Sequence, residues 1–213
     1  MQRVLSLALV ILLSQAGGSA AAEAEAGTVR TVRVWAYGTP PAAARRDLFA
    51  NAAVFVEERL ETVADGALDV RLRDDTSLRL GGATTVVLDR FVYDPASGGA
   101  LAVSITKGAC RFITGATADR FVVTSPSVTV APRGTQFSVW VFADGTTKVW
   151  VQAGEVTVTP LSGGPPALVR RGEIVAASTK GGGVQRNALR PETDPGLLPS
   201  LDTGAVPRGK NGR

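Results

Sequence analysis

Carboxylates are the side chains of this sequence whose type and spacing could support catalysis or bind a cation. Asp65, Asp69, Asp74 and Asp75 lie close together in the chain. Two carboxylates facing one cleft can act as the acid and base of a glycosidase, and several together can bind calcium. Asp65-Gly66 and Asp74-Asp75 also have the composition of tight turns, and we favour this structural role. The sequence therefore gives no catalytic, cofactor-binding or metal-binding residue.

Histidine is absent from the sequence, and Cys110 is its only cysteine. Without histidine, Ser-His-Asp catalysis, Cys-His catalysis and most zinc sites are excluded. The sequence also has no phosphate loop and no dinucleotide-binding fingerprint. Cys110 is either a reactive or bridging thiol or a small buried residue, and its shared strand parity with Phe112 favours burial. We predict a protein that is not an enzyme and needs no cofactor.

A β-hairpin is predicted from Gly134 to Thr159, with its turn at Ala143-Asp144-Gly145. A two-residue Asp-Gly turn would pair Val139 with Trp150, whereas a three-residue loop with Gly145 in the left-handed region would pair Val139 with Val149. We prefer the second register because it gives one continuous apolar face. That face consists of Phe137, Val139, Val141, Val149 and Val151.

The preferred register places Trp140, Phe142 and Trp150 together on the opposite face of the hairpin. Either another layer or the C-terminal tail covers these rings, or they form an exposed apolar patch of the kind that marks a binding surface. Trp140, Phe142 and Trp150 are therefore the candidate binding residues.

Apolar and polar residues alternate repeatedly along the chain, as in Leu68, Val70 and Leu72. Strands about 8–12 residues apart, with turn residues between them, indicate an all-β fold of short antiparallel strands and hairpins. They would form a solenoid-like roll or a sandwich. The best helix candidate is the stretch 42–53, which follows Pro40-Pro41.

Three zones are predicted along the chain. Residues 1–26 have the basic, apolar and small-residue order of a signal peptide, with cleavage after Ala22, Ala24 or Ala26. Residues 27–178 form the all-β domain, and residues 179–213 form a disordered, basic Gly/Pro-rich tail. Because the signal is too short for a permanent anchor and no later apolar run is long enough, we expect no transmembrane anchor after cleavage.

Several segments of the predicted domain carry a recognisable pattern. The most specific is Arg133-Gly134-Thr135-Gln136-Phe137, which is followed by the segment from Thr147 to Val158, and together they resemble the FecR domain family. Asp75 to Leu80 resembles the family's turn, although Thr76 stands where glycine is usual. The resemblance extends over roughly residues 60–178.

The resemblance implies an exported, non-enzymatic interaction or signal-relay module of the periplasm or the secreted fraction. Its expected partner is another envelope protein, and nucleic acid is not expected as a partner. The alternative is a protein that binds peptidoglycan or another polysaccharide of the cell envelope, with the aromatic rings as stacking platforms. The net charge of +4 is compatible with binding to such anionic envelope polymers.

Overall fold

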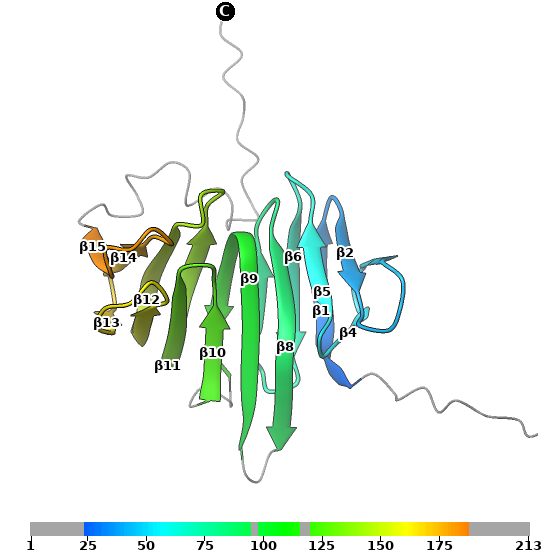
Figure 1. Ribbon diagram of the computed structural model, residues 1–213. Helices are drawn as coiled ribbons and strands as arrows, with labels where there is room; N and C mark the ends of the chain where they lie inside the picture. Colours follow the sequence, from blue (N-terminus) through cyan, green and yellow to red (C-terminus); the bar gives the residue numbers. More distant parts are fainter. Residues whose placement is uncertain (1–23, 95–97, 116–119, 188–213) are drawn as a thin grey trace, which may run out of the picture.

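The computed structural model describes residues 24–94, 98–115 and 120–187, and this part of the chain is nearly all β (Figure 1). Hydrogen bonds join its fifteen strands into one open sheet. The strands are β1 (Glu25–Arg33), β2 (Ala36–Thr39), β3 (Arg46–Asp47), β4 (Ala53–Phe55), β5 (Arg59–Thr62), β6 (Ala67–Leu72), β7 (Ser77–Leu80), β8 (Thr85–Asp94), β9 (Gly98–Ile113), β10 (Phe121–Thr124), β11 (Val128–Val141), β12 (Thr147–Pro160), β13 (Ala167–Arg170), β14 (Ile174–Ala177) and β15 (Gln185–Asn187).

The all-β prediction is confirmed, and the helix considered for residues 42–53 is wrong. That stretch contains β3 and the first residue of β4. Pro40 and Pro41, which precede it, fix φ and have no backbone N–H, so they favour an irregular segment as readily as a helix start. Among the described residues, no helix is long and apolar enough to cross a membrane.

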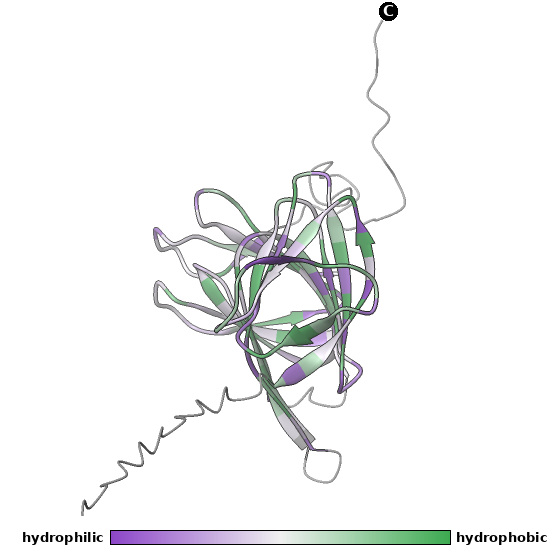
Figure 2. Cartoon of the chain, turned by 90° about the vertical axis from the view of Figure 1, so that its right-hand side faces the viewer, coloured by the Kyte–Doolittle hydropathy of each residue, from purple (hydrophilic) through white to green (hydrophobic). Residues whose placement is uncertain are grey.

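The strands lie in two rows that share the long strands β9, β11 and β12. The first row has the order β3-β2-β5-β8-β9-β10-β11-β12-β13. The second has the order β4-β1-β6-β7-β9-β11-β12-β14-β15. Neighbours are antiparallel, apart from the parallel pair β9–β10. Figure 2 shows how the sheet curls. Apolar side chains of both rows belong to one core cluster.

Each long strand changes its neighbours at a glycine with positive φ. β9 leaves β8 after Lys107 and pairs with β7 and β11 beyond Gly108, where φ is 89°. The corresponding glycines are Gly134 in β11, with φ 57°, and Gly154 in β12, with φ 76°. The left-handed region favours glycine, so these residues let one strand serve both rows. Both Gly134 and Gly154 lie inside long strands and not at strand ends.

The predicted hairpin register is confirmed. Val139 pairs with Val149, Val141 pairs with Thr147, and Gly145 has φ 80°. The face that carries Phe137, Val139, Val141, Val149 and Val151 is buried in the core, as expected.

The ordered sheet extends beyond both predicted boundaries of the domain. β1 includes Glu25 and Ala26, and the Ala26 side chain is completely buried in the core. At the other end, β15 pairs with β14 inside the stretch that the sequence assigns to a disordered tail. Most of the predicted signal peptide and residues 188–213 lie outside the described residues.

Replacing Gly154 by alanine should destabilise the fold more than replacing Gly134. A Cβ at Gly154 would lie 2.6 Å from Thr135 Cγ2 and 2.7 Å from the Gly134 carbonyl oxygen, whereas at Gly134 it would meet nothing within 4 Å. Both changes force alanine into the left-handed region, which costs about 1–2 kcal/mol. We expect Gly154→Ala to cost at least about 1 kcal/mol more in the free energy of unfolding, as measured by urea denaturation. Equal losses would contradict the packing shown here.

Candidate functional site

The outer surface of the second strand row is built as a ladder of directly paired residues. One line of successive pairing partners crosses the strands β6, β7, β9, β11 and β12 in this order. It consists of Asp69, Arg79, Arg111, Ser138 and Trp150. Because alternate residues of a strand point to opposite faces, this ladder lies outside the core formed by the intervening residues. It is polar toward β6 and becomes apolar toward β14, where Trp150 pairs with Ile174.

Two of the three candidate aromatic residues lie together at the apolar end of this surface. Trp140 is only 4% exposed and forms a small cluster with Ala109 of β9 and Ile174 of β14. Trp150 is half-buried and packs against the same cluster. Of the two alternatives predicted for these rings, coverage or exposure, Trp140 therefore shows coverage. Its ring is not available as a contact surface.

Phe142 is the exposed member of the candidate set, with 41% of its surface accessible. Its ring lies at the end of β11, and the Lys148 ammonium is 5.5 Å from the ring centroid. The same two residues line a pocket of about 480 Å³ at the hairpin end, together with Ala143, Asp144 and Thr146. An aromatic ring beside a cation, a hydroxyl and a carboxylate can bind an apolar group and orient it by polar contacts.

Asp144 belongs to the rigid part of this pocket. Its carboxylate accepts hydrogen bonds from the backbone N–H of Thr146 at 2.9 Å and from the Thr146 hydroxyl at 3.0 Å. These hydrogen bonds lower the pKa of Asp144 below its ordinary value. The carboxylate thus remains charged at neutral pH while it fixes the turn.

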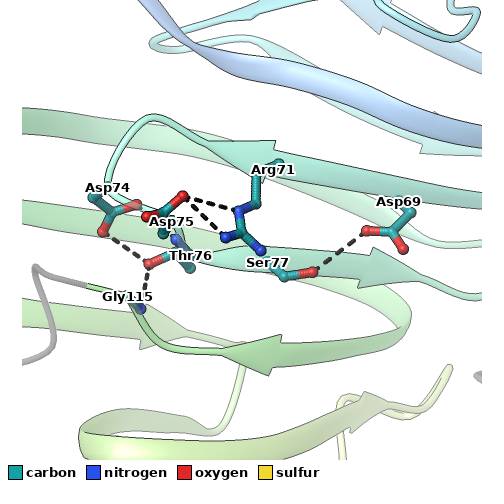
Figure 3. Close-up of polar contacts among 7 residues, drawn as sticks. All are labelled: Asp69, Arg71, Asp74, Asp75, Thr76, Ser77 and Gly115. Carbon is teal, nitrogen blue, oxygen red and sulfur yellow. Dashed lines mark hydrogen bonds and ion pairs between the residues drawn. The ribbon is translucent and has the colours of Figure 1, made fainter.

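Three of the four aspartates considered for catalysis or calcium binding, Asp69, Asp74 and Asp75, contact neighbouring side chains instead (Figure 3), and Asp65 is exposed. Asp74 accepts hydrogen bonds from the Thr76 N–H at 3.0 Å and from its hydroxyl at 2.8 Å, and Asp75 forms an ion pair with Arg71. Thr76 Oγ1 accepts a hydrogen bond from the Gly115 N–H at 2.9 Å. This contact gives Thr76 a role in tying the β6–β7 turn to the end of β9.

Metal-binding geometry is absent from the part of the chain that the structure describes, where no group of three histidine, cysteine, aspartate or glutamate residues converges. Cys110 is completely buried in the core, and this burial raises the pKa of its thiol far above the ordinary value. A neutral, inaccessible thiol is a poor nucleophile, so the buried interpretation of Cys110 is the one that the structure supports.

Two features of the N-terminal strands were not predicted from the sequence. Trp35 and Phe49 are 55% and 66% exposed, and the backbone hydrogen bond from Leu48 N to Ala36 O holds their segments side by side. Glu58 is completely buried and accepts 2.8 Å hydrogen bonds from Arg46 Nη2 and from the Phe55 N–H. Neither feature has a local sequence signal, because both depend on how β2, β3 and β5 meet.

Comparison with known proteins finds a family model that matches the central part of the chain. The family model described as FecR protein matches residues 58–157. Two crystal structures of a putative anti-sigma factor from Parabacteroides distasonis ATCC 8503 are similar to the chain, with TM-scores of 0.51 and 0.50 and 19% sequence identity. Each comparison covers 61% of this chain and 58% of that chain, less than two thirds of its length. At this identity the similarity is one of fold. None of the curated proteins matches the chain significantly.

Cys110 should resist alkylation in the folded protein. Its thiol is completely buried and has a raised pKa, so little thiolate is present or accessible. We expect iodoacetamide to modify the native protein at pH 8 at least about 100-fold more slowly than the protein unfolded in guanidinium chloride, as followed by mass spectrometry. Because the chain has one cysteine, the signal reports this site alone. Similar rates in both states would show that the core around β9 opens readily.

Proposed function

We propose, on the premise that residues 58–157 form a FecR domain, that this protein is a non-enzymatic module that relays a signal by contacting another protein of the cell envelope. The FecR match is the observation that carries this proposal. The similarity of fold to a putative anti-sigma factor supports it. The two strand rows that curl around one core also support the solenoid-like roll that the resemblance implies (Figure 2).

The contact surface in this proposal is the end of the β11–β12 hairpin. Phe142 is the exposed ring of the candidate set, and the pocket beside it offers the Lys148 ammonium and the Asp144 carboxylate. Exposed aromatic residues with polar groups at their rim are typical of the residues that dominate protein interfaces. Trp140 and Trp150 lie behind this surface and hold the outer sides of β11 and β12 against β14.

A binding role fits the chemistry of the described side chains better than a catalytic one. Asp74 and Asp75 are engaged within their own turn, and Cys110 is sealed in the core. The chain contains no histidine that could act as a general base at neutral pH.

Export belongs to the same proposal, with the periplasm or the secreted fraction as the location. The basic start and the apolar run of residues 1–26 support it. The position of Ala26 in the core also bears on the cleavage site, because cleavage after Ala26 would remove a buried residue of β1.

The exported protein should begin at Glu23 or Glu25. Cleavage after Ala22 or Ala24 leaves Ala26 in the core and keeps the hydrogen bond from the Arg73 N–H to the Ala26 carbonyl oxygen, 3.0 Å long. N-terminal sequencing of the protein from the periplasmic or secreted fraction of the producing cell measures this directly. A mature chain that begins at Gly27 would contradict the inferred cleavage site, and a protein found only in the cytoplasm would contradict export.

Phe142→Ala should weaken contact with the partner without unfolding the protein. We expect a loss of about 10-fold or more in capture, because truncating an aromatic hot-spot residue at an interface costs about 2 kcal/mol or more. A photo-crosslinking amino acid at position 143, in the lining of the pocket, would join the partner in intact cells, and mass spectrometry would identify it.

Leu161→Ala is the matched control, because Leu161 is also exposed, at 55%, but lies beyond the C-terminal end of β12. Both variants should retain the circular dichroism spectrum of the wild type. Equal crosslinking by the wild type and the Phe142→Ala variant would contradict the proposed surface.

Binding to an envelope polysaccharide is the second candidate, and one observation favours it. Stacking on a sugar needs accessible rings, and Trp35 and Phe49 supply them whereas Trp140 does not. Retention on purified peptidoglycan that is lost in a Trp35→Ala/Phe49→Ala variant, but not in Phe142→Ala, would favour this candidate over the protein-contacting module.

A further inference from the structure

One outer edge of the sheet is left open along the second half of β8. This strand pairs with β5 only from Thr85 to Val87, and Leu88 then bonds with the backbone just before β5. Beyond Leu88, β9 is the one strand neighbour of β8 in the part of the chain that the structure describes. The end of β8 and the start of β9 also reach farther than the strands around them (Figure 1). Residues 89–94 therefore form an edge strand that stands out from the body of the sheet.

A β-bulge decides which side chains of this edge strand face solvent. The register of β8 with β9 shifts between Val87 and Arg90, and the alternation of side chains along β8 reverses there. Phe91 consequently packs against the core, and its ring centroid lies 6.4 Å from that of Tyr93. Val92 points to the other side and is 49% exposed. The edge strand thus has an aromatic face and a solvent face with an apolar residue at its centre.

An open edge of this length is a template for a strand of another chain. An edge strand presents backbone N–H and C=O groups to solvent, and these groups pair readily with an added strand. Proteins commonly protect such edges with proline or lysine, and residues 89–94 contain neither. An added strand would also stabilise the protruding part of β8 and β9, because a two-stranded ribbon is only marginally stable in water.

The sequence of the edge strand is complementary to itself when two copies run antiparallel. With Val92 opposite its own copy, Phe91 lies opposite Tyr93, and position 90 lies opposite position 94. Aromatic and apolar pairs stabilise a sheet, whereas directly opposed like charges destabilise it. Arg90 and Asp94 differ in sign of charge, so this register opposes no like charges, whatever other contacts the two side chains make. A centre at Phe91 or Tyr93 would instead place Val92 opposite a charged residue.

We propose that residues 89–94 of β8 are the contact surface of a homodimer, in which two copies pair antiparallel about a two-fold axis beside Val92. The same patch then serves both subunits, as in the isologous interfaces of symmetric dimers. The two ribbons of β8 and β9 join into one four-stranded sheet across the axis. This surface does not include the end of the β11–β12 hairpin, so the dimer is independent of the proposed function.

Sedimentation velocity of the full chain tests the dimer, and Val92→Asp tests its surface. We expect the wild type to pass from monomer to dimer as its concentration rises over about a hundred-fold range. Val92→Asp places two carboxylates opposite each other at the axis and should weaken the dimer at least about 10-fold. Because Val92 is exposed, the variant should retain the circular dichroism spectrum of the wild type. A wild type that stays monomeric over the whole range overturns the proposal.

Val34→Asp is the matched control for the added charge. Val34 is also a valine with 49% of its surface exposed, and it lies between β1 and β2, outside the proposed surface. Its φ of 63° is one that aspartate adopts more readily than valine, so the change should leave the fold intact. We expect it to change dimerisation less than about two-fold. An equal loss in both variants would overturn the proposal, because added negative charge alone would then separate the copies.

Cysteine substitutions test the register of the two copies. Directly opposed residues of an antiparallel pair have Cα atoms about 4.5–5.5 Å apart, which a disulfide can span. Val92→Cys should therefore form a disulfide-linked dimer under mild oxidation, as seen by non-reducing electrophoresis, while the buried Cys110 does not compete. In Arg90→Cys the two thiols are offset by four residues along the strands, about 13 Å, and should not cross-link. Equal cross-linking of both variants, or of neither, would overturn the proposed pairing.

Discussion

The contact between Phe112 and Phe137 is the interaction on which the rest of the structure depends. The two residues pair directly across β9 and β11, and their rings stack with centroids 5.0 Å apart. Phe121 of β10 contacts both rings, at 5.5 and 6.2 Å. All three side chains are buried, and a slip of one residue between β9 and β11 would turn the apolar set of a strand outward. The core therefore fixes the register.

The register that buries the phenylalanines also determines what the outer face presents. With Phe112 and Phe137 inside, Arg111 and Ser138 are paired on the outside, and so are Ala109 and Trp140. The polar and apolar ends of the outer ladder are thus consequences of core packing. The proposed hairpin contact is carried by two strands of this framework, β11 and β12. A recognition surface built this way is preorganised, which lowers the entropic cost of binding.

Glycines at positive φ explain how so many strands form one sheet around one core. Gly108, Gly134 and Gly154 let the long strands β9, β11 and β12 pass between the two rows. In the Arg133-Gly134-Thr135 segment, the glycine turns the strand, and Thr135 N–H then donates a 2.9 Å hydrogen bond to the Thr114 hydroxyl. Phe137 follows two residues later and enters the core. The most specific segment of the FecR resemblance therefore has a structural reason.

The sequence by itself determined the features that depend on neighbouring residues. Alternation with period two predicted the all-β class and the burial of Cys110 beside Phe112, and the Asp144-Gly145 turn predicted the pairing of Val139 with Val149. These predictions succeeded because strand periodicity and turn conformation are local properties.

Only the tertiary structure decided which side chains remain accessible. Trp140 is buried because Ala109 of β9 and Ile174 of β14, both distant in sequence, pack against it, whereas Phe142 stays exposed at the hairpin end. The opposition of Arg79 and Arg111 and the exposure of Trp35 and Phe49 likewise arise from pairings between separate segments. Alternation assigns a residue to a face of its own strand, but the strands beside it decide whether that face is covered.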